Sequence, residues 1–151
     1  SRAAKTYGVR KFFVVTPLED QKKLVDQIVA HWITGVGGQN NPKRREALEL
    51  INVRDSLAEV VEEIARREGN APKIAVTSAR EGRRGVTCRG RRGERNEGTT
   101  CLLVFGTAWE LSEEVIEAAD YLLEPIRGRD KYNHLSVRSA TAIILDRLLA
   151  A

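Results

Sequence analysis

Short apolar runs of the strand type alternate with stretches of helical periodicity through most of this chain. The runs occupy residues 11–15, 51–54, 73–77, 101–105 and 121–123. Strands that are joined through helices pair in parallel, with right-handed crossovers. The sequence therefore predicts an α/β fold, with a mainly parallel five-stranded sheet flanked by helices in one domain spanning residues 1–151.

Capping residues mark where the predicted helices begin. Thr16 and Glu19 form a capping-box pattern around Pro17, and apolar residues at three- and four-residue spacing follow until Gly35, Gly37 and Gly38 end the helix. This pattern predicts a long helix with one apolar stripe facing the sheet. Serine caps predict three more helices, at residues 56–69, 112–119 and 136–150.

The composition excludes several classes of protein. With 42% hydrophobic and 30% charged residues, the chain is too apolar for disorder, and its 151 residues suit one domain. It contains no apolar run long enough to cross a bilayer and no charged-then-apolar leader. Two cysteines and two distant histidines give neither a disulfide scaffold nor metal-ligand spacing. We expect a cytoplasmic protein with reduced thiols, no metal and no membrane partner.

The sequence contains no methionine, so Ser1 does not read as a native start. We expect a segment to precede it.

Basic charge is concentrated in one segment. Seven arginines lie between residues 80 and 95 against two glutamates, which gives +5 in a chain whose net charge is +4. Glycines and the lack of apolar periodicity predict a mobile basic loop over residues 80–99. Arginine forks suit phosphate oxygens, so Arg80, Arg83 and Arg84 are candidate RNA contacts, and Arg44 and Arg45 extend the candidate basic rim. Solvated loop and helix charges without a partner are the alternative.

Small residues follow three of the predicted strands, and a fourth segment enters the last helix. Ligands of parallel α/β sheets bind beyond the carboxyl ends of the strands, where small residues let main-chain groups approach a ligand closely. Such residues are also common in plain turns. The chain contains neither a dinucleotide-binding glycine pattern nor a P-loop. The segments are residues 77–79, 106–109, 124–128 and 132–138.

These same segments resemble a known family. The sequences GTAW at residues 106–109, DYLLEPIRG at 120–128, YNHLSVRSA at 132–140 and AIILDRL at 142–148 are similar to the C-terminal half of bacterial SPOUT-class RNA methyltransferases. Within that class, the chain is similar to the small group related to the C-terminal region of tRNA guanine-N1 methyltransferases. Residues 6–9, 16–21, 31–32 and 41–42 fit the same group, so the resemblance covers nearly the whole chain.

The resemblance implies a C-terminal trefoil knot, a homodimer, and S-adenosylmethionine bound bent among the knot loops. It also implies a strand-bearing segment before the point where this chain begins. By the same likeness, the cofactor pocket consists of Thr77, Ser78, Phe105, Gly106, Thr107, Ala108, Leu123, Glu124, Pro125, Ile126, Gly128, Asn133, His134, Leu135, Ser136 and Val137. Ala108 and Glu110 stand where the family usually has glycines.

The methyl acceptor on the RNA must be oriented and must lose a proton. Because guanidinium groups stay charged, Arg127 and Arg138 are assigned to orienting phosphate or substrate. Asn133 and Ser136 are candidates for positioning the acceptor, although capping the last helix explains them equally well. The proton acceptor stays open among Glu110, Glu124 and Asp130.

The sequence thus predicts an S-adenosylmethionine-dependent RNA methyltransferase that acts on tRNA or rRNA, at a base nitrogen or a ribose hydroxyl. Two alternatives remain open. One is a catalytically inactive module that binds S-adenosylmethionine or RNA, and the other is an α/β enzyme acting on a small metabolite.

Overall fold

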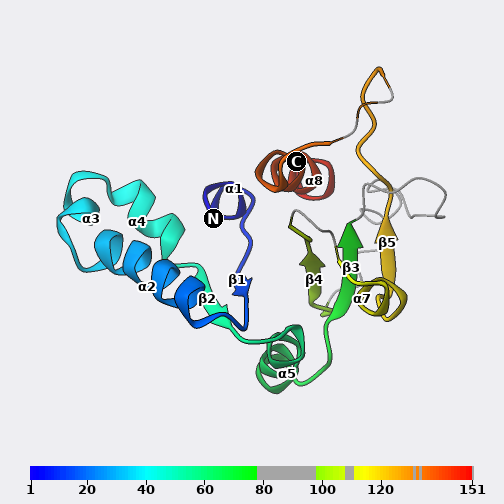
Figure 1. Ribbon diagram of the computed structural model, residues 1–151, viewed down its shortest axis with the longest axis horizontal. Coiled ribbons are helices and arrows are strands. Elements are labelled where there is room, and N and C mark those ends of the chain that lie inside the picture. The colour runs from blue at the N-terminus through cyan, green and yellow to red at the C-terminus, as the bar shows by residue number, and fades with distance from the viewer. Residues whose placement is uncertain (78–97, 108–110, 131, 133, 151) are drawn as a thin grey trace. The chain divides into compact units, whose positions relative to one another are not determined.

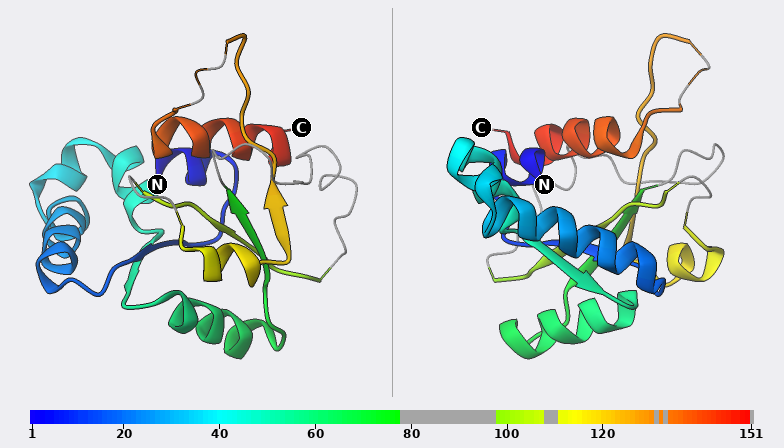
Figure 2. Two further views of the ribbon diagram at one scale, coloured as in Figure 1. Left: turned by 45° about the vertical axis from the view of Figure 1, so that its right-hand side comes forward. Right: turned by 60° about the vertical axis from the view of Figure 1, so that its left-hand side comes forward.

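The computed structural model describes residues 1–77, 98–107, 111–130, 132 and 134–150. The chain divides into two compact units, Ser1–Arg67 and Glu68–Ala151 (Figure 1; Figure 2 gives two further views). The first unit contains α1 (Arg2–Thr6), β1 (Phe12–Val15), α2 (Glu19–Ile33), α3 (Val36–Asn40), α4 (Pro42–Leu48), β2 (Ile51–Arg54) and nearly all of α5 (Leu57–Glu68). The second contains β3 (Lys73–Thr77), β4 (Cys101–Val104), α7 (Glu113–Glu117), β5 (Tyr121–Leu123) and α8 (Val137–Leu149).

All strand pairs in the described residues are parallel, but the strands form two sheets. β1 pairs with β2, and the second sheet has the order β4-β3-β5. The α/β class is confirmed, whereas the predicted single sheet of five strands is not found. The alternation of strands and helices along a sequence predicts parallel pairing but does not specify which strand edges meet.

In the first unit, an ionic cluster connects α5 to the sheet. The Glu63 carboxylate accepts hydrogen bonds from Lys11 Nζ at 2.7 Å and from Arg54 Nε at 2.7 Å. These two hydrogen bonds hold the pKa of Glu63 below its ordinary value, against the opposing effect of burial. Both cations also lie over the ring of Phe13 on β1, at 5.7 and 5.9 Å from its centroid. One carboxylate on α5 therefore binds side chains from both ends of the β1–β2 pair.

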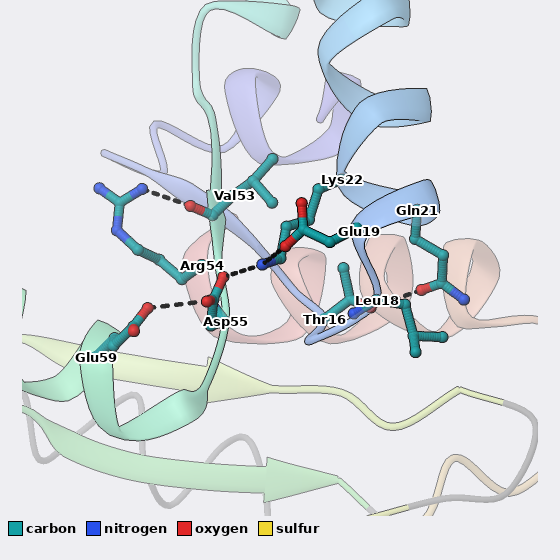
Figure 3. Close-up of polar contacts among 9 residues, drawn as sticks. All are labelled: Thr16, Leu18, Glu19, Gln21, Lys22, Val53, Arg54, Asp55 and Glu59. Atoms are coloured by element: carbon teal, nitrogen blue, oxygen red, sulfur yellow. Dashed lines mark hydrogen bonds and ion pairs between the residues drawn. The ribbon is translucent and has the colours of Figure 1, made fainter.

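The predicted capping box at the start of α2 is wrong. The Thr16 hydroxyl accepts from Leu18 N at 3.2 Å and donates to Gln21 Oε1 at 2.7 Å, and it is the one buried polar side chain in the described residues (Figure 3). The hydroxyl therefore closes a turn ahead of the helix, and α2 begins at Glu19 without a side-chain cap. The second predicted cap is present, because Ser56 Oγ accepts from Glu59 N at 3.2 Å.

The apolar stripe of α2 is not buried as predicted. Leu24 and Ile28 are 56% and 47% exposed, and no residue of α2 is fully buried. The helix packs against α3 and α4, which the sequence pattern did not predict. The glycines expected only to end α2 instead allow this close packing. Gly37 and Gly38 are buried within α3, directly against the last turn of α2.

Gly38→Ala should destabilise the protein by about 2 kcal/mol or more, because an added Cβ would lie 2.1 Å from the carbonyl oxygen of Trp32. Gly128→Ala is the matched control: the nearest atom to its added Cβ is 3.9 Å away, so its free energy of unfolding should change by less than about 0.5 kcal/mol. Urea unfolding measures both. Equal changes in the two variants would contradict the packing described here.

In the second unit, α8 packs on the three-stranded sheet. Ala75 on β3, Leu123 on β5 and Ile144 on α8 are buried together, and Phe105, Ile126 and Leu148 pack against them. The predicted serine caps are both present, since Ser112 Oγ accepts from Val115 N and Ser136 Oγ accepts from Ser139 N. Cap and core together fix where α8 begins relative to the strands.

At the amino ends of the same strands, Asp120 connects β5 to β3. Its carboxylate accepts from Lys73 Nζ at 2.6 Å and from the main-chain N of Ile74 at 2.8 Å. These hydrogen bonds hold the pKa of Asp120 below its ordinary value near 3.8. The contact sets the axial position of β5 against β3, and thereby the position of the segment that follows Leu123.

The stabilisation from Asp120 should depend on pH. Because its pKa is lower in the folded chain than in the unfolded chain, the stabilisation is complete above the unfolded value and is lost as pH falls through the folded value. The wild type should therefore exceed Asp120→Asn in stability by about 1 kcal/mol or more at pH 7 and by much less at pH 3. Urea unfolding at both pH values measures this, and an unchanged difference would contradict it.

None of the helices among the described residues has both the length and the apolar character needed to cross a bilayer. Nor does any group of three or more His, Cys, Asp or Glu side chains gather in the described ranges so that it could hold a metal ion.

Candidate functional site

The carboxyl ends of β3, β4 and β5 meet at one edge of the three-stranded sheet. Thr77 lies opposite Leu123, and Val76 lies opposite both Val104 and Leu122. The Thr77 hydroxyl donates to the carbonyl of Val104 at 3.5 Å. The parallel register thus brings together the described part of three segments that the sequence nominated: Thr77, then Phe105, Gly106 and Thr107, then Leu123, Glu124, Pro125 and Ile126.

This edge has an apolar floor and a polar rim. Leu123 is 1% exposed, and Phe105 and Ile126 pack on the same core. Thr107 and Glu124, at the same edge, are exposed. Among the described residues, no main-chain hydrogen bond outside the regular elements involves residues 105–107 or 124–128. Main-chain groups of residues 105–107 and 124–126 therefore lie beside apolar side chains.

These features fit S-adenosylmethionine. Apolar side chains and neighbouring main-chain groups suit a purine ring, and the Glu124 carboxylate provides negative charge for a sulfonium or an acceptor for ribose hydroxyls. The residues that would hold the cofactor are Thr77, the segment 105–107 and the segment 124–126. Gly128 differs from the others, because a Cβ there would meet only ordinary contact at 3.9 Å, so no steric demand requires glycine at that position.

The segment from the end of β5 into the first turn of α8 contains Arg127 and Arg138, the candidates for orienting the RNA, and also His134, Leu135 and Val137, which were predicted to belong to the cofactor pocket. Arg127, His134 and Arg138 are exposed, and Leu135 and Val137 are 45% and 40% exposed. In Figure 1 and in both views of Figure 2 this segment, drawn in orange, extends beyond the end of β5 before it returns to α8. Arg127 and His134 belong to this projection, whereas Val137 and Arg138 lie in the first turn of α8.

Ser136 caps α8, which is the alternative role expected for it from the sequence. Its Oγ accepts from Ser139 N at 3.2 Å and lies 3.0 Å from Ser139 Oγ, so it caps α8. The same oxygen is exposed to solvent and remains a candidate for contacting the methyl acceptor.

The remaining nominated residues divide into two groups. Arg44 lies 4.5 Å over the ring of Trp32, and Arg45 forms an ion pair with Glu49 at 3.1 Å, so both already have partners within the first unit. Ser78, Arg80, Arg83, Arg84, Ala108 and Asn133 lie outside the described residues, as do Glu110 and the basic loop up to residue 97.

A polar group in the first unit was not foreseen. Lys22 Nζ binds the Glu19 carboxylate at 2.7 Å and also the Asp55 carboxylate (Figure 3). These contacts, that with Asp55 above all, raise the pKa of Lys22. Asp55 directly follows β2, so the rule that draws attention to strand ends would have found it. One lysine binds both carboxylates, and the group connects the start of α2 to the end of β2.

Ser136→Ala should lower the free energy of unfolding by about 1 kcal/mol, because Ser139 N loses its acceptor. Ser136→Asp should retain most of the stability, since its carboxylate can accept the same hydrogen bond. Ser139→Ala is the control, because it keeps the main-chain donor. Thermal or urea unfolding measures all three, and a Ser136→Ala variant as stable as Ser139→Ala would refute the cap.

Comparison with known proteins agrees with these features. A family model described as SAM-dependent RNA methyltransferase matches residues 1–150. Two proteins named tRNA (guanine-N(1)-)-methyltransferase, from Nitratidesulfovibrio vulgaris and Oleidesulfovibrio alaskensis, are 47% and 41% identical over 98% of this chain. The chain spans about a third of their length (34%). An uncharacterized protein of Aquifex aeolicus is 35% identical over 99% of this chain and 74% of its own length.

Solved structures share the fold. A probable methyltransferase from Bordetella pertussis superimposes with a TM-score of 0.69 at 21% identity, over 97% of this chain and 80% of that one. A putative methylase family protein from Neisseria gonorrhoeae gives 0.66 at 20% identity, over 99% of this chain and 73% of that one.

Proposed function

The chain belongs to the SAM-dependent RNA methyltransferase family, and on that basis we propose that it methylates tRNA, using S-adenosylmethionine held at the carboxyl ends of β3, β4 and β5. The observation that carries the proposal is the meeting of three nominated segments at one sheet edge, over an apolar floor. The names of the two longer relatives support tRNA as the substrate class. The methyl acceptor is a base nitrogen or a ribose hydroxyl.

The residues of this edge have distinct tasks. Thr77, Phe105, Gly106, Thr107, Leu123, Pro125 and Ile126 bind the donor and exclude water, and Glu124 faces its positive charge. When bound, S-adenosylmethionine supplies an electrophilic methyl group. Arg127 and Arg138 orient the RNA phosphates, and Ser136, with Asn133, holds the acceptor in line. Glu124 and Asp130 are the described carboxylates that can accept the acceptor's proton.

The architecture proposed with this function is that of the SPOUT class. Both units form one domain with a C-terminal trefoil knot, the protein acts as a cytoplasmic homodimer, and Arg80, Arg83 and Arg84 contact RNA phosphates. A family model that runs across both units supports the single domain. The proposal of a knot is supported by the family resemblance of the segment that enters α8.

The function is tested by incubating the purified chain with methyl-labelled S-adenosylmethionine and unmodified tRNA. One labelled nucleoside should appear on mass spectrometry. All nucleosides are scored, because this chain matches only 34% of the length of the named guanine-N1 relatives. Saturable donor binding without any labelled nucleoside, on tRNA or rRNA, would instead indicate the inactive binding module.

Glu124→Lys should weaken donor binding about 10-fold or more, because it places a cation beside the sulfonium. Glu117→Lys is the matched control. It makes the same change of charge at another exposed position of the same unit, but at the end of α7 that leads to the amino end of β5. Calorimetric titration with S-adenosylmethionine measures both variants. Equal affinities of Glu124→Lys and Glu117→Lys would contradict the placement of the site.

A further inference from the structure

Tyr132 is the most exposed large hydrophobic side chain in the described residues. Its exposed fraction is 76%, compared with 67% for Val36 and 56% for Leu24. It belongs to the segment that leaves the carboxyl end of β5 and enters α8. A solvent-exposed aromatic ring lacks the contacts that packing in the core would give it. Its exposure next to a ligand-binding edge therefore points to a binding partner that covers the face of the ring.

A second ring supports that of Tyr132 from the side. The His134 ring lies 5.6 Å from the Tyr132 ring, centroid to centroid, at an interplanar angle of 68°. In this T-shaped arrangement the edge of one ring meets the face of the other, so His134 restrains the tyrosine and can cover at most one of its faces. At least one face of the Tyr132 ring therefore stays open to another planar group.

The charges around the pair favour a nucleic acid. Residues 124–138 contain Arg127, Arg129, Lys131 and Arg138 against Glu124 and Asp130, which gives 4 − 2 = +2. Arg127, Arg129 and Arg138 are exposed. Aromatic faces that stack on bases, together with cations that follow the phosphates, are the usual means of holding single-stranded RNA. An apolar protein surface would use the ring but would gain nothing from these arginines.

We propose that Tyr132, braced by His134, stacks on an unpaired base of the RNA substrate beside the site of methyl transfer. The inference rests on the proposed function, from which it takes RNA as the substrate class. It adds that Tyr132 selects unstacked nucleotides. Arg127 and Arg138 then bind the flanking phosphates. The ring recognises a base by its face, so it contributes affinity for a loop or bulge without reading the base's edge.

The first test measures RNA affinity with the whole chain and an unmodified tRNA transcript. Tyr132→Ala should weaken binding about 10-fold, whereas Tyr132→Phe should bind as the wild type does, because phenylalanine keeps the stacking face. Val36→Ala, which shortens another highly exposed apolar side chain, is the control and should change nothing. Wild-type affinity in Tyr132→Ala would overturn the inference.

The salt dependence separates stacking from charge. Tyr132→Ala should lower affinity without changing the slope of log K against log salt, whereas Arg127→Gln should reduce that slope by about one phosphate contact. A changed slope in Tyr132→Ala would mean that the ring acts only by holding the arginines in place, and would overturn the stacking role.

Crosslinking locates the contact directly. Transcripts containing 4-thiouridine should crosslink to the tryptic peptide of residues 132–138, which lies between cleavage sites at Lys131 and Arg138. The crosslink should fall on Tyr132. Crosslinks that avoid this peptide, or a Tyr132→Ala variant that loses donor affinity but keeps RNA affinity, would place the ring elsewhere and refute the inference. Absence of methyl transfer with this crosslink intact would refute only the proposed function.

Discussion

The parallel register around β3 is the constraint on which the candidate site depends. β3 is the central strand of its sheet, and Ala75 and Val76 on it are 1% and 0% exposed. Asp120 fixes β5 against β3 at the amino ends, through Lys73 and Ile74. Because parallel strands end at the same edge, fixing one end determines which segments meet at the other. The donor site proposed for this chain is therefore set by contacts far from the cofactor itself.

Much of the local structure could be predicted from the sequence, because strongly local signals specify it. All five strands lie within the predicted apolar runs, and Ser56, Ser112 and Ser136 each accept the main-chain hydrogen bond of an N-cap. Thr16 does not cap α2, because its hydroxyl donates to the Gln21 side chain and accepts from the main-chain N of Leu18. The number of sheets and the exposure of Leu24 and Ile28 depend on which elements meet, and helical periodicity carries no information about that.

The candidate site was also predictable only in part. The strand-end rule correctly nominated residues that the sheet brings together, from Thr77 to Ile126, since the rule follows from the direction of the strands. The role of Ser136 could not be decided from its residue type, because a hydroxyl that caps a helix and one that contacts a substrate look alike in a sequence. Tyr132 was visible within a family-like motif, but only its 76% exposure and its contact with His134 distinguish it from a core tyrosine.

The most direct measurement of the central claim is a titration of the isotope-labelled chain with S-adenosylmethionine, followed through the backbone amide signals of the protein. The proposed donor site uses main-chain groups after β4 and β5, so the largest shifts should fall on Gly106, Thr107 and Ile126. The amides of Gly37, Gly38 and the remainder of α3 should not move. Saturable shifts that spare residues 105–107 and 124–128 would contradict the account, whatever activity the protein displays.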